Sequence, residues 1–402
     1  MVFIENNHGK GMGMDKQSKL ERATRAEAAG VDPLSGTSTL HRTGRRGTRS
    51  VVAVVVSTVA VLLAACSSGS GGTPTTSSAG GTATTSGAPV TVRLGYLTNL
   101  THASALVGLQ HGIFAKNLPS NATLQTSTYN AGPAEVTALL AGSLDVAYMG
   151  PNSAITAYSQ GNKAIRIISG ATSGGAALVV APSITSADQL KGKTLATPQL
   201  GNTQDVALRT WLTKQGITYP GPNGGSGQVT ILPEDNATTL ASFEAGTIAG
   251  AWVPEPWATR MVSEGSGHVL VNEKSQWPKG QFSTTVLVVS TDFLSAHPAL
   301  VTDLLKAQLA TTTFLNANPA TAQADANTEL ATLTGKPLKA PELATAWSDL
   351  TFTNDPIATS IVTDLSHAKA AGFPPSNITG IFDLGPVNKL LRAQGSPALS
   401  GA

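Results

Sequence analysis

Between residues 90 and 290, short apolar runs alternate with longer segments of helical pattern, and this alternation limits the possible folds more than any other feature. Strands followed by helices in this way build a largely parallel sheet that is covered by helices. The first series predicts strands at residues 90–96, 123–129, 145–149, 165–169 and 176–181. The helices predicted between them cover residues 103–117, 133–141 and 151–160.

A second series of the same kind follows and predicts a second lobe with its own core. Its predicted strands are 194–197, 229–232, 249–253, 268–271 and 284–290. Its predicted helices are 187–191, 203–215, 236–245 and 257–264. From Asp292 onward the pattern is mainly helical, and this tail is expected to pack on the first lobe.

The N-terminal region has a secretory pattern that ends at Cys66, the one cysteine of the chain. Arginines precede an uncharged run at 51–65, and small residues stand directly before Cys66. The run is shorter than the roughly 20 apolar residues that a transmembrane helix needs. A structural disulfide is excluded because no second cysteine exists. An apolar segment that ends on cysteine resembles the bacterial lipobox, in which that cysteine is lipidated and becomes the mature N-terminus.

The segment after Cys66 consists only of Ser, Gly, Thr, Ala and Pro as far as residue 88. Such a composition cannot form a core and predicts a disordered tether with a span of about 25 Å. The formal charge is +2 for the whole chain and becomes −2 without residues 1–65. The sequence therefore gives no reason to expect a nucleic-acid partner.

Four loops of the body share one design, in which a strand ends, small or polar residues follow and a helix begins. Ligands bind α/β sheets at the carboxyl ends of strands, and free N–H groups at helix starts attract anions without any lysine or arginine. Each such Ser, Thr or Asn can equally be an ordinary helix cap, so the prediction of an oxyanion site depends on the four loops together. The loops are 99–102, 130–133, 150–153 and 201–205.

The segment 252–257 places Glu255 between two prolines and two tryptophans. The prolines stiffen the turn, and indole rings offer apolar walls with N–H donors, so a wall of a ligand cleft is one interpretation. A rigid turn with core tryptophans and a capping glutamate is the other. His102 can likewise contact ligand or be a capping or packing residue, and Asp205 is either a ligand contact or a first-turn acid.

Motifs of known enzyme classes are absent from the sequence. It has no GxSxG, HExxH or Walker motif and no Cys/His spacing of a metal site. Glu234 and Asp235 are adjacent acids that are expected to be solvated rather than catalytic. We therefore expect neither catalytic residues nor a metal or cofactor.

Several local motifs together are similar to one family, the solute-binding proteins of ABC importers for nitrate, taurine and aliphatic sulfonates. The resemblance covers nearly all of residues 90–400. It is carried by the segments 92–96, 131–133, 141–147, 150–154, 188–193, 201–205 and 243–246, with Ala251 and Trp252.

The resemblance implies an α/β fold of the periplasmic-binding-protein type II class, in which two lobes are joined by two crossing segments with a cleft between them. The crossings are expected near Ala181–Pro182 and Gly280–Gln281. The implied division is a leader at 1–65, a lipidated cysteine and tether at 66–88, a first lobe at 89–181 plus 282–402, and a second lobe at 182–281.

The same resemblance, together with the loop pattern, nominates a set of ligand-binding residues. The anionic head is expected at the starts of two first-lobe helices, and the second lobe is expected to close over it. The nominated residues are Asn99, His102, Gly132, Pro133, Asn152, Ser153, Thr172, Gly201, Asn202, Thr203, Trp252, Glu255 and Trp257.

The leading functional hypothesis is an exported, monomeric solute-binding protein that is anchored to the outer face of the cytoplasmic membrane through lipid on Cys66. It would capture a small organic anion, with an aliphatic sulfonate first, and deliver it to an ABC permease. Nitrate, bicarbonate, taurine and thiamine precursors stay open as ligands. An enzyme on the same scaffold, or a sensory or adhesion lipoprotein, is the alternative class.

Overall fold

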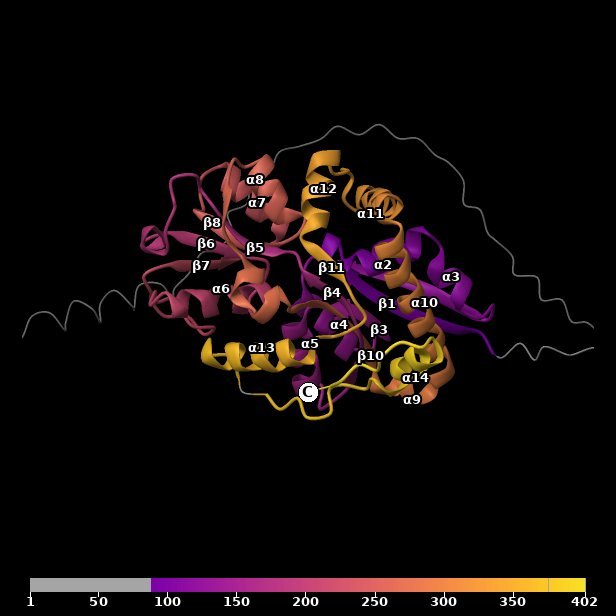
Figure 1. Ribbon diagram of the computed structural model, residues 1–402. Helices are drawn as coiled ribbons and strands as arrows, with labels where there is room; N and C mark the ends of the chain where they lie inside the picture. Colours follow the sequence, from indigo (N-terminus) through magenta and orange to yellow (C-terminus); the bar gives the residue numbers. More distant parts are fainter. Residues whose placement is uncertain (1–87, 375, 402) are drawn as a thin grey trace, which may run out of the picture. The chain divides into compact units, whose positions relative to one another are not determined.

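The computed structural model describes residues 88–374 and 376–401 (Figure 1). Cys66, the apolar run before it and the predicted tether up to residue 87 lie outside the described residues. The predictions about the leader and the lipidated cysteine are therefore not addressed by the fold.

Six strands form the first sheet, in the order β11-β4-β10-β3-β1-β2. β1 pairs in parallel with β2 and β3, whereas β10 runs antiparallel to β3 and β4, and β11 runs antiparallel to β4. The strands are β1 (Val90–Leu97), β2 (Ala122–Tyr129), β3 (Val146–Met149), β4 (Ile165–Gly174), β10 (Ser283–Ser290) and β11 (Leu350–Phe352).

Five strands form the second sheet, in the order β7-β6-β8-β5-β9. β6 pairs in parallel with β7 and β8, and β5 runs antiparallel to β8 and β9. The strands are β5 (Ala176–Val180), β6 (Thr194–Thr197), β7 (Thr230–Pro233), β8 (Gly250–Pro254) and β9 (His268–Asn272).

The α/β fold is confirmed, but the prediction of largely parallel sheets is wrong, because both sheets are mixed. The reason lies in the strands next to the passages between sheets: β5 and β10 each enter their sheet antiparallel to both neighbours. The first passage occurs at Gly174 and Gly175, which both have φ near +80°. It therefore precedes β5, whereas the predicted crossing at Ala181–Pro182 follows that strand. The chain returns to the first sheet between β9 and β10, which end and begin at Asn272 and Ser283.

Helices flank both sheets, and most begin where a strand has just ended. The predicted helix at 103–117 is two helices, because Gly112 between them takes a left-handed conformation with φ +69°. Helices before the tail are α2 (Ala103–Gln110), α3 (Ile113–Asn117), α4 (Gly132–Leu140), α5 (Pro151–Gln160), α6 (Thr203–Lys214), α7 (Asn236–Glu244) and α8 (Trp257–Ser263). Short 3-10 turns cover Leu100–His102, Ala187–Leu190, Glu273–Gln276 and Pro278–Gly280.

The helical tail contacts elements of both sheets. Its helices α10 and α11 pack on α2, as expected for a tail that returns to the first lobe. In contrast, α12 packs on α8 and α13 packs on α6, which are helices of the second sheet. The tail helices are α9 (Thr291–Ala296), α10 (Pro298–Ala317), α11 (Pro319–Thr334), α12 (Ala340–Ser348), α13 (Ala358–Ala370) and α14 (Gly385–Ala393).

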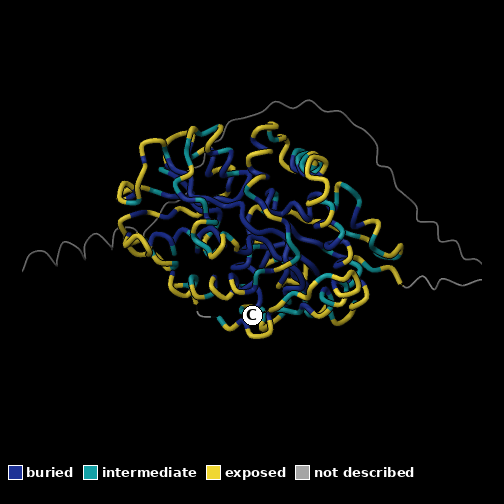
Figure 2. The backbone as a smooth tube through the Cα atoms, viewed as in Figure 1, coloured by how far each residue is buried: buried dark blue, intermediate teal, exposed yellow. Residues whose placement is uncertain are grey.

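Each sheet has buried apolar clusters associated with it, and Figure 2 shows the buried segments concentrated along the strands. Leu94 and Tyr148 belong to the largest cluster, which the tail helices α10 and α11 cover. Leu178 and Trp252 belong to a cluster of the second sheet. Among the described residues, we find no helix with the length and hydropathy required to span a bilayer.

Candidate functional site

A cavity of about 590 Å³ lies where helices of the two sheets meet the tail. Four of the residues nominated from the sequence line it: Pro133, Asn152, Ser153 and Gly201. Its volume falls in the range of pockets that hold small organic molecules. This cavity is the candidate binding site.

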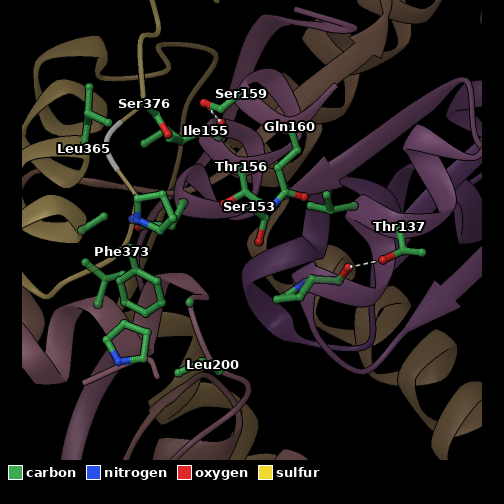
Figure 3. A pocket seen from close by; sticks show the side chains of 18 of the residues that line it. Thr137, Ser153, Ile155, Thr156, Ser159, Gln160, Leu200, Leu365, Phe373 and Ser376 are labelled. Carbon is green, nitrogen blue, oxygen red and sulfur yellow. Dashed lines mark hydrogen bonds between the residues drawn. The ribbon is translucent and has the colours of Figure 1, made fainter. Parts of the chain in front are cut away.

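One wall of the cavity is a polar stripe on α5. Pro151 occupies the first helical turn, where its missing N–H costs nothing. Five polar side chains then recur on the side of the helix that faces the cavity, and Figure 3 shows several of them in the centre and upper centre of the view. The stripe consists of Asn152, Ser153, Thr156, Ser159 and Gln160.

Asn152 is the most informative residue of this polar stripe. It is 3% exposed, and neither its amide nitrogen nor its amide oxygen has a hydrogen-bond partner in the structure. A buried amide without partners costs roughly 1–3 kcal/mol, so proteins rarely retain one without a reason. Because Asn152 lines the cavity, a ligand is the natural partner of its amide.

The start of α4 meets the start of α5 beside this residue. Gly132 stands so close to Ser153 that any Cβ at position 132 would collide with the serine hydroxyl. Pro133 follows in the first turn and lines the cavity. The absence of a side chain at Gly132 therefore lets two helix N-termini, each with free N–H groups, lie side by side.

The start of α6 approaches from the second sheet. A Cβ at Gly150 would lie 2.5 Å from Thr203 Oγ1, so the chain entering α5 and the first residue of α6 are in direct contact. Thr203 is buried and its hydroxyl has no partner. Gly201, with φ +77°, lines the cavity just before the helix. Three helix starts from both sheets thus converge on one place.

Asn202 and Asp205 hold the α6 start in position. Asn202 Oδ1 accepts a hydrogen bond from the Asp205 backbone N–H at 2.9 Å, which is an ordinary N-cap. Asp205 in turn accepts from the Gly201 N–H at 2.9 Å, the Thr197 hydroxyl and Arg209 Nε. The Arg209–Asp205 pair is almost completely buried. Both predicted residues therefore fix the loop, and neither lines the cavity.

The wall opposite α5 is apolar, and most of it comes from the tail. Leu365 and Ala368 of α13, with Phe373 and Pro374 beyond the helix, line this side. Figure 3 shows Leu365 and Phe373 on the left side of the view, across the opening from Ser153 and Thr156. The sequence prediction contained none of these tail residues.

Two other nominated residues form a link between the sheets rather than a cavity wall. Trp257, at the start of α8, donates its indole N–H to Asn99 Oδ1 at 2.9 Å. A second hydrogen bond joins the same two segments, because the Leu100 N–H donates to the Glu255 carbonyl at 3.0 Å. Neither Asn99 nor Trp257 is among the residues that line the cavity.

His102 is buried, and its Nδ1 accepts a hydrogen bond from the Leu97 N–H at 3.2 Å. Burial lowers the pKa of His102 to about 3, so the ring is neutral at physiological pH. Thr172 of β4 is also buried, and its hydroxyl has no partner, but it does not line the cavity. His102 is thus a packed residue that bonds to the end of β1, since its side chain makes no cap hydrogen bond to α2 and does not line the cavity.

The proline-flanked segment 252–257 of the second sheet does not line the main cavity. Trp252 is fully buried and donates its indole N–H to Glu273 Oε2 at 2.6 Å. The carboxylate of Glu255 accepts from the N–H and hydroxyl of Thr259, both at 3.1 Å, and thereby caps α8. Burial raises the pKa of Glu255 to about 7, although these two bonds oppose the rise. Glu255 lines a second cavity, of about 390 Å³, between α8 and α12.

No residue that lines the main cavity carries a charge, within the part of the chain that the structure describes. In the same part, no group of three or more His, Cys, Asp or Glu side chains is arranged to hold a metal ion. The potential at this site is therefore set by backbone and amide dipoles, and three helix starts make it favourable for a negative group.

Sequence reasoning missed much of the cavity lining, for two different reasons. The polar stripe of α5 was detectable, because positions 152, 156 and 159 follow helical spacing on a helix that was predicted. The tail residues Leu365 and Phe373 gave no such signal, since only the packing of α13 on α5 and α6 brings them to the site.

Comparison with solved structures shows the fold. The alkanesulfonate-binding protein SsuA from Xanthomonas axonopodis pv. citri, solved bound to MOPS, superposes with a TM-score of 0.58 at 19% identity, over 70% of this chain and 92% of that chain. The periplasmic nitrate-binding protein NrtA from Synechocystis PCC 6803 superposes with a TM-score of 0.62 at 15% identity, over 77% of this chain and 90% of that one. The predicted type II periplasmic-binding-protein fold is thereby confirmed.

Sequence comparison adds the family. A taurine-binding periplasmic protein from Escherichia coli (strain K12) is 27% identical over 224 residues, which are 55% of this chain and 65% of that protein. The chain spans less than two thirds of the length of the sequence relatives it matches. The model of the NMT1-like family matches residues 86–331. Because this match covers more than half of the sequence and agrees with the fold, the chain belongs to the NMT1-like family.

Proposed function

We propose that this protein is the extracytoplasmic solute-binding component of an ABC importer and that it captures a small organic anion, with sulfonates first, in the main cavity. The observation that carries this proposal is the convergence of the α4, α5 and α6 starts on a cavity lined by the unpartnered amide of Asn152. The names of the relatives, which include taurine-, alkanesulfonate- and nitrate-binding proteins, support the same class.

The arrangement explains how an anion can bind without a cation. The first N–H groups of a helix have no partner inside the helix, and the helix dipole places partial positive charge there. A sulfonate has three oxygens that need donors. The Asn152 amide, the Ser153 hydroxyl and the free N–H groups of α4 and α5 supply donors from the first sheet, and Gly201 lies on the second-sheet side.

Release to a permease requires that the site opens, and the contacts between the two sheets suggest how. The polar stripe belongs to a helix of the first sheet, whereas Gly201 and Val206 belong to the second. A ligand that contacts both favours the closed arrangement, because those contacts exist only when the parts are together. Trp257, bonded to Asn99 across the same junction, would report such a movement.

Titration of the purified body, residues 89–402, with taurine, methanesulfonate, butanesulfonate and nitrate tests the proposal. We expect a change in tryptophan fluorescence and a rise in melting temperature at micromolar concentrations of at least one sulfonate. Trp257→Phe should remove most of the fluorescence change while the rise in melting temperature persists. Unchanged fluorescence and melting temperature with every member of the panel would contradict the proposal.

Export and lipid attachment form the second part of the proposal and are supported by the sequence alone. The pattern around Cys66 implies that the mature chain starts at a lipidated cysteine, which keeps the binding protein near its permease and raises its effective concentration. Cys66→Ala should leave ligand affinity unchanged and move the protein from the membrane fraction to the soluble fraction. Equal membrane retention of the variant and the parent would refute lipidation.

A further inference from the structure

The two walls of the main cavity have opposite chemistry. The α5 wall presents mainly amide and hydroxyl groups, with Ile155 among them, whereas Leu365 and Phe373 lie across the opening (Figure 3). Leu200 and Val206 add apolar side chains to the cavity lining. A bare oxyanion such as nitrate can use only the first wall. Filling the remaining space with water would leave the apolar side chains hydrated and would gain nothing from them.

The tail residues of the apolar wall lie beyond the family match, whereas Leu200 and Val206 lie within it. That match ends at residue 331, whereas α13 begins at Ala358 and Phe373 follows it. The family match therefore carries no information about Leu365 and Phe373.

Phe373 is held in place by contacts on several sides. Its N–H donates to the Ala368 carbonyl at 3.0 Å and so ties it to the end of α13. Its ring centroid lies 5.7 Å from the Arg209 guanidinium carbon, and a Cβ built on Gly201 would lie 3.1 Å from a ring atom. Gly372, with φ +89°, provides the turn that brings the ring there. A positioned aromatic face at a cavity wall is a typical contact surface for an apolar group.

We infer that the ligand carries an apolar body, an alkyl chain of several carbons or an aryl ring, that lies against Leu365, Ala368 and Phe373 while its polar head lies at Asn152 and Ser153. The identity of the head as an anion rests on the proposed function. The apolar body follows independently from the tail wall and from a volume of about 590 Å³. The tail of the chain is then the determinant of specificity.

A homologous series of alkanesulfonates tests the inference, because the sulfonate group stays constant while the alkyl chain becomes longer. Each buried methylene is expected to strengthen binding by about fourfold, so hexanesulfonate, with five more methylenes, should bind on the order of a thousandfold more tightly than methanesulfonate. Isothermal titration calorimetry of the protein with methane-, butane- and hexanesulfonate measures how affinity depends on the length of the alkyl chain. Equal affinity for the three compounds would overturn the inference while leaving the proposed anion site intact.

Substitutions in the apolar wall test whether the C-terminal tail causes the dependence of affinity on chain length. Leu365→Ala and Phe373→Ala should each flatten the dependence on chain length, so that the preference for hexanesulfonate over methanesulfonate falls at least tenfold. Val362→Ala is the matched control, because Val362 lies on the same helix but is exposed and does not line the cavity. A preference that is unaltered in both wall variants would overturn the assignment.

An uncharged fluorescent probe tests the apolar wall independently of the anionic group of the ligand. N-Phenyl-1-naphthylamine, whose fluorescence rises in apolar surroundings, should bind the body, and Phe373→Ala should weaken that binding at least tenfold relative to Val362→Ala. If no sulfonate binds but the probe does so through Phe373, the proposed head is wrong and the apolar wall stands. Probe binding that does not depend on Phe373, with no preference among sulfonates, would reject the wall.

Discussion

Two helix starts with nearly the same sequence design behave in opposite ways. At α5 the residues Gly150–Ser153 leave the Asn152 amide buried and without a partner. At α6 the residues Gly201–Asp205 place Asn202 as an N-cap whose oxygen accepts from Asp205 at 2.9 Å. The comparison teaches that an asparagine at a helix start indicates a binding site only when its side-chain amide is buried and has no hydrogen-bond partner nearby in the chain.

The α6 start is held by hydrogen bonds among its own polar groups, although the Thr203 hydroxyl has no partner. Asp205 accepts from three donors, and one of them is a guanidinium buried to the same degree. The α5 start has no such network and keeps its donors available. We therefore assign support of the site to α6 and contact with the ligand head to α5. Three variants test this division, and a fourth examines the start of α8.

The largest effect is expected from the network under α6. Arg209→Leu leaves the buried Asp205 carboxylate without its cation, and the loss of one partner of a buried pair costs roughly 3–5 kcal/mol of unfolding free energy. Urea unfolding measures the change. Lys191→Ala, which removes an exposed ion pair with Asp188, is the control and should change stability by less than about 0.5 kcal/mol. Similar losses in the two variants would contradict the supporting role of the network.

The start of α8 extends the comparison to an acid. Burial raises the pKa of Glu255 from 4.5 to about 7, so the folded state prefers the protonated carboxyl. This preference stabilises the fold fully below pH 4.5 and is lost as the pH rises through 7, a difference of about 3 kcal/mol. Glu255→Gln should remove this contribution, so the unfolding free energy should fall less between pH 4.5 and 8 in the variant than in the parent. Parallel pH profiles would show that the environment of Glu255 does not favour its neutral form.

Asn152→Ala should affect binding rather than stability. A hydrogen bond to a charged group contributes about 1.5–3 kcal/mol, so the dissociation constant of a bound sulfonate should rise about ten- to a hundredfold. Removing a buried amide without partners should leave the melting temperature of the ligand-free protein equal or higher. Asn121→Ala, far along the chain at the start of β2, is the control for both measurements. A lower melting temperature with unchanged affinity would reverse the roles of the two helix starts.

Asn202→Ala should produce the smallest effect. Loss of an N-cap costs about 1 kcal/mol, and chemical unfolding should show this decrease. Affinity should change less than in Asn152→Ala, since Asn202 does not line the cavity. An affinity loss equal to that of Asn152→Ala would show that both asparagines contact the ligand.

The local pattern predicted most of the elements, because apolar periodicity and turn residues act over a few positions. The strand at 123–129 and the helix at 151–160 lie close to their observed bounds. Strand direction was not predictable in the same way. Whether β10 runs parallel or antiparallel to β3 depends on where the chain re-enters the first sheet, and nothing within the strand itself encodes that choice.

The candidate site likewise contains residues that local sequence pattern predicts and residues whose role only the fold determines. Pro133, Asn152, Ser153 and Gly201 were nominated because helix starts after strands face one edge of an α/β sheet, and all four line the cavity. Glu255 was nominated from its unusual surroundings, and the structure places its carboxylate against Thr259 and a second cavity. Chemistry at a turn is visible in sequence, but the direction in which a side chain points depends on the backbone around it.

The sequence by itself determined the α/β class and the loops that lead from strands into helices, and it predicts export from the pattern that ends at Cys66. These are local properties, set by periodicity, turn chemistry and composition. The tertiary structure alone decided which asparagine stays without a partner and that Phe373 reaches the cavity from the far end of the chain. Both outcomes depend on contacts between residues that are distant in sequence, and such contacts exist only once the sheets and the tail have packed.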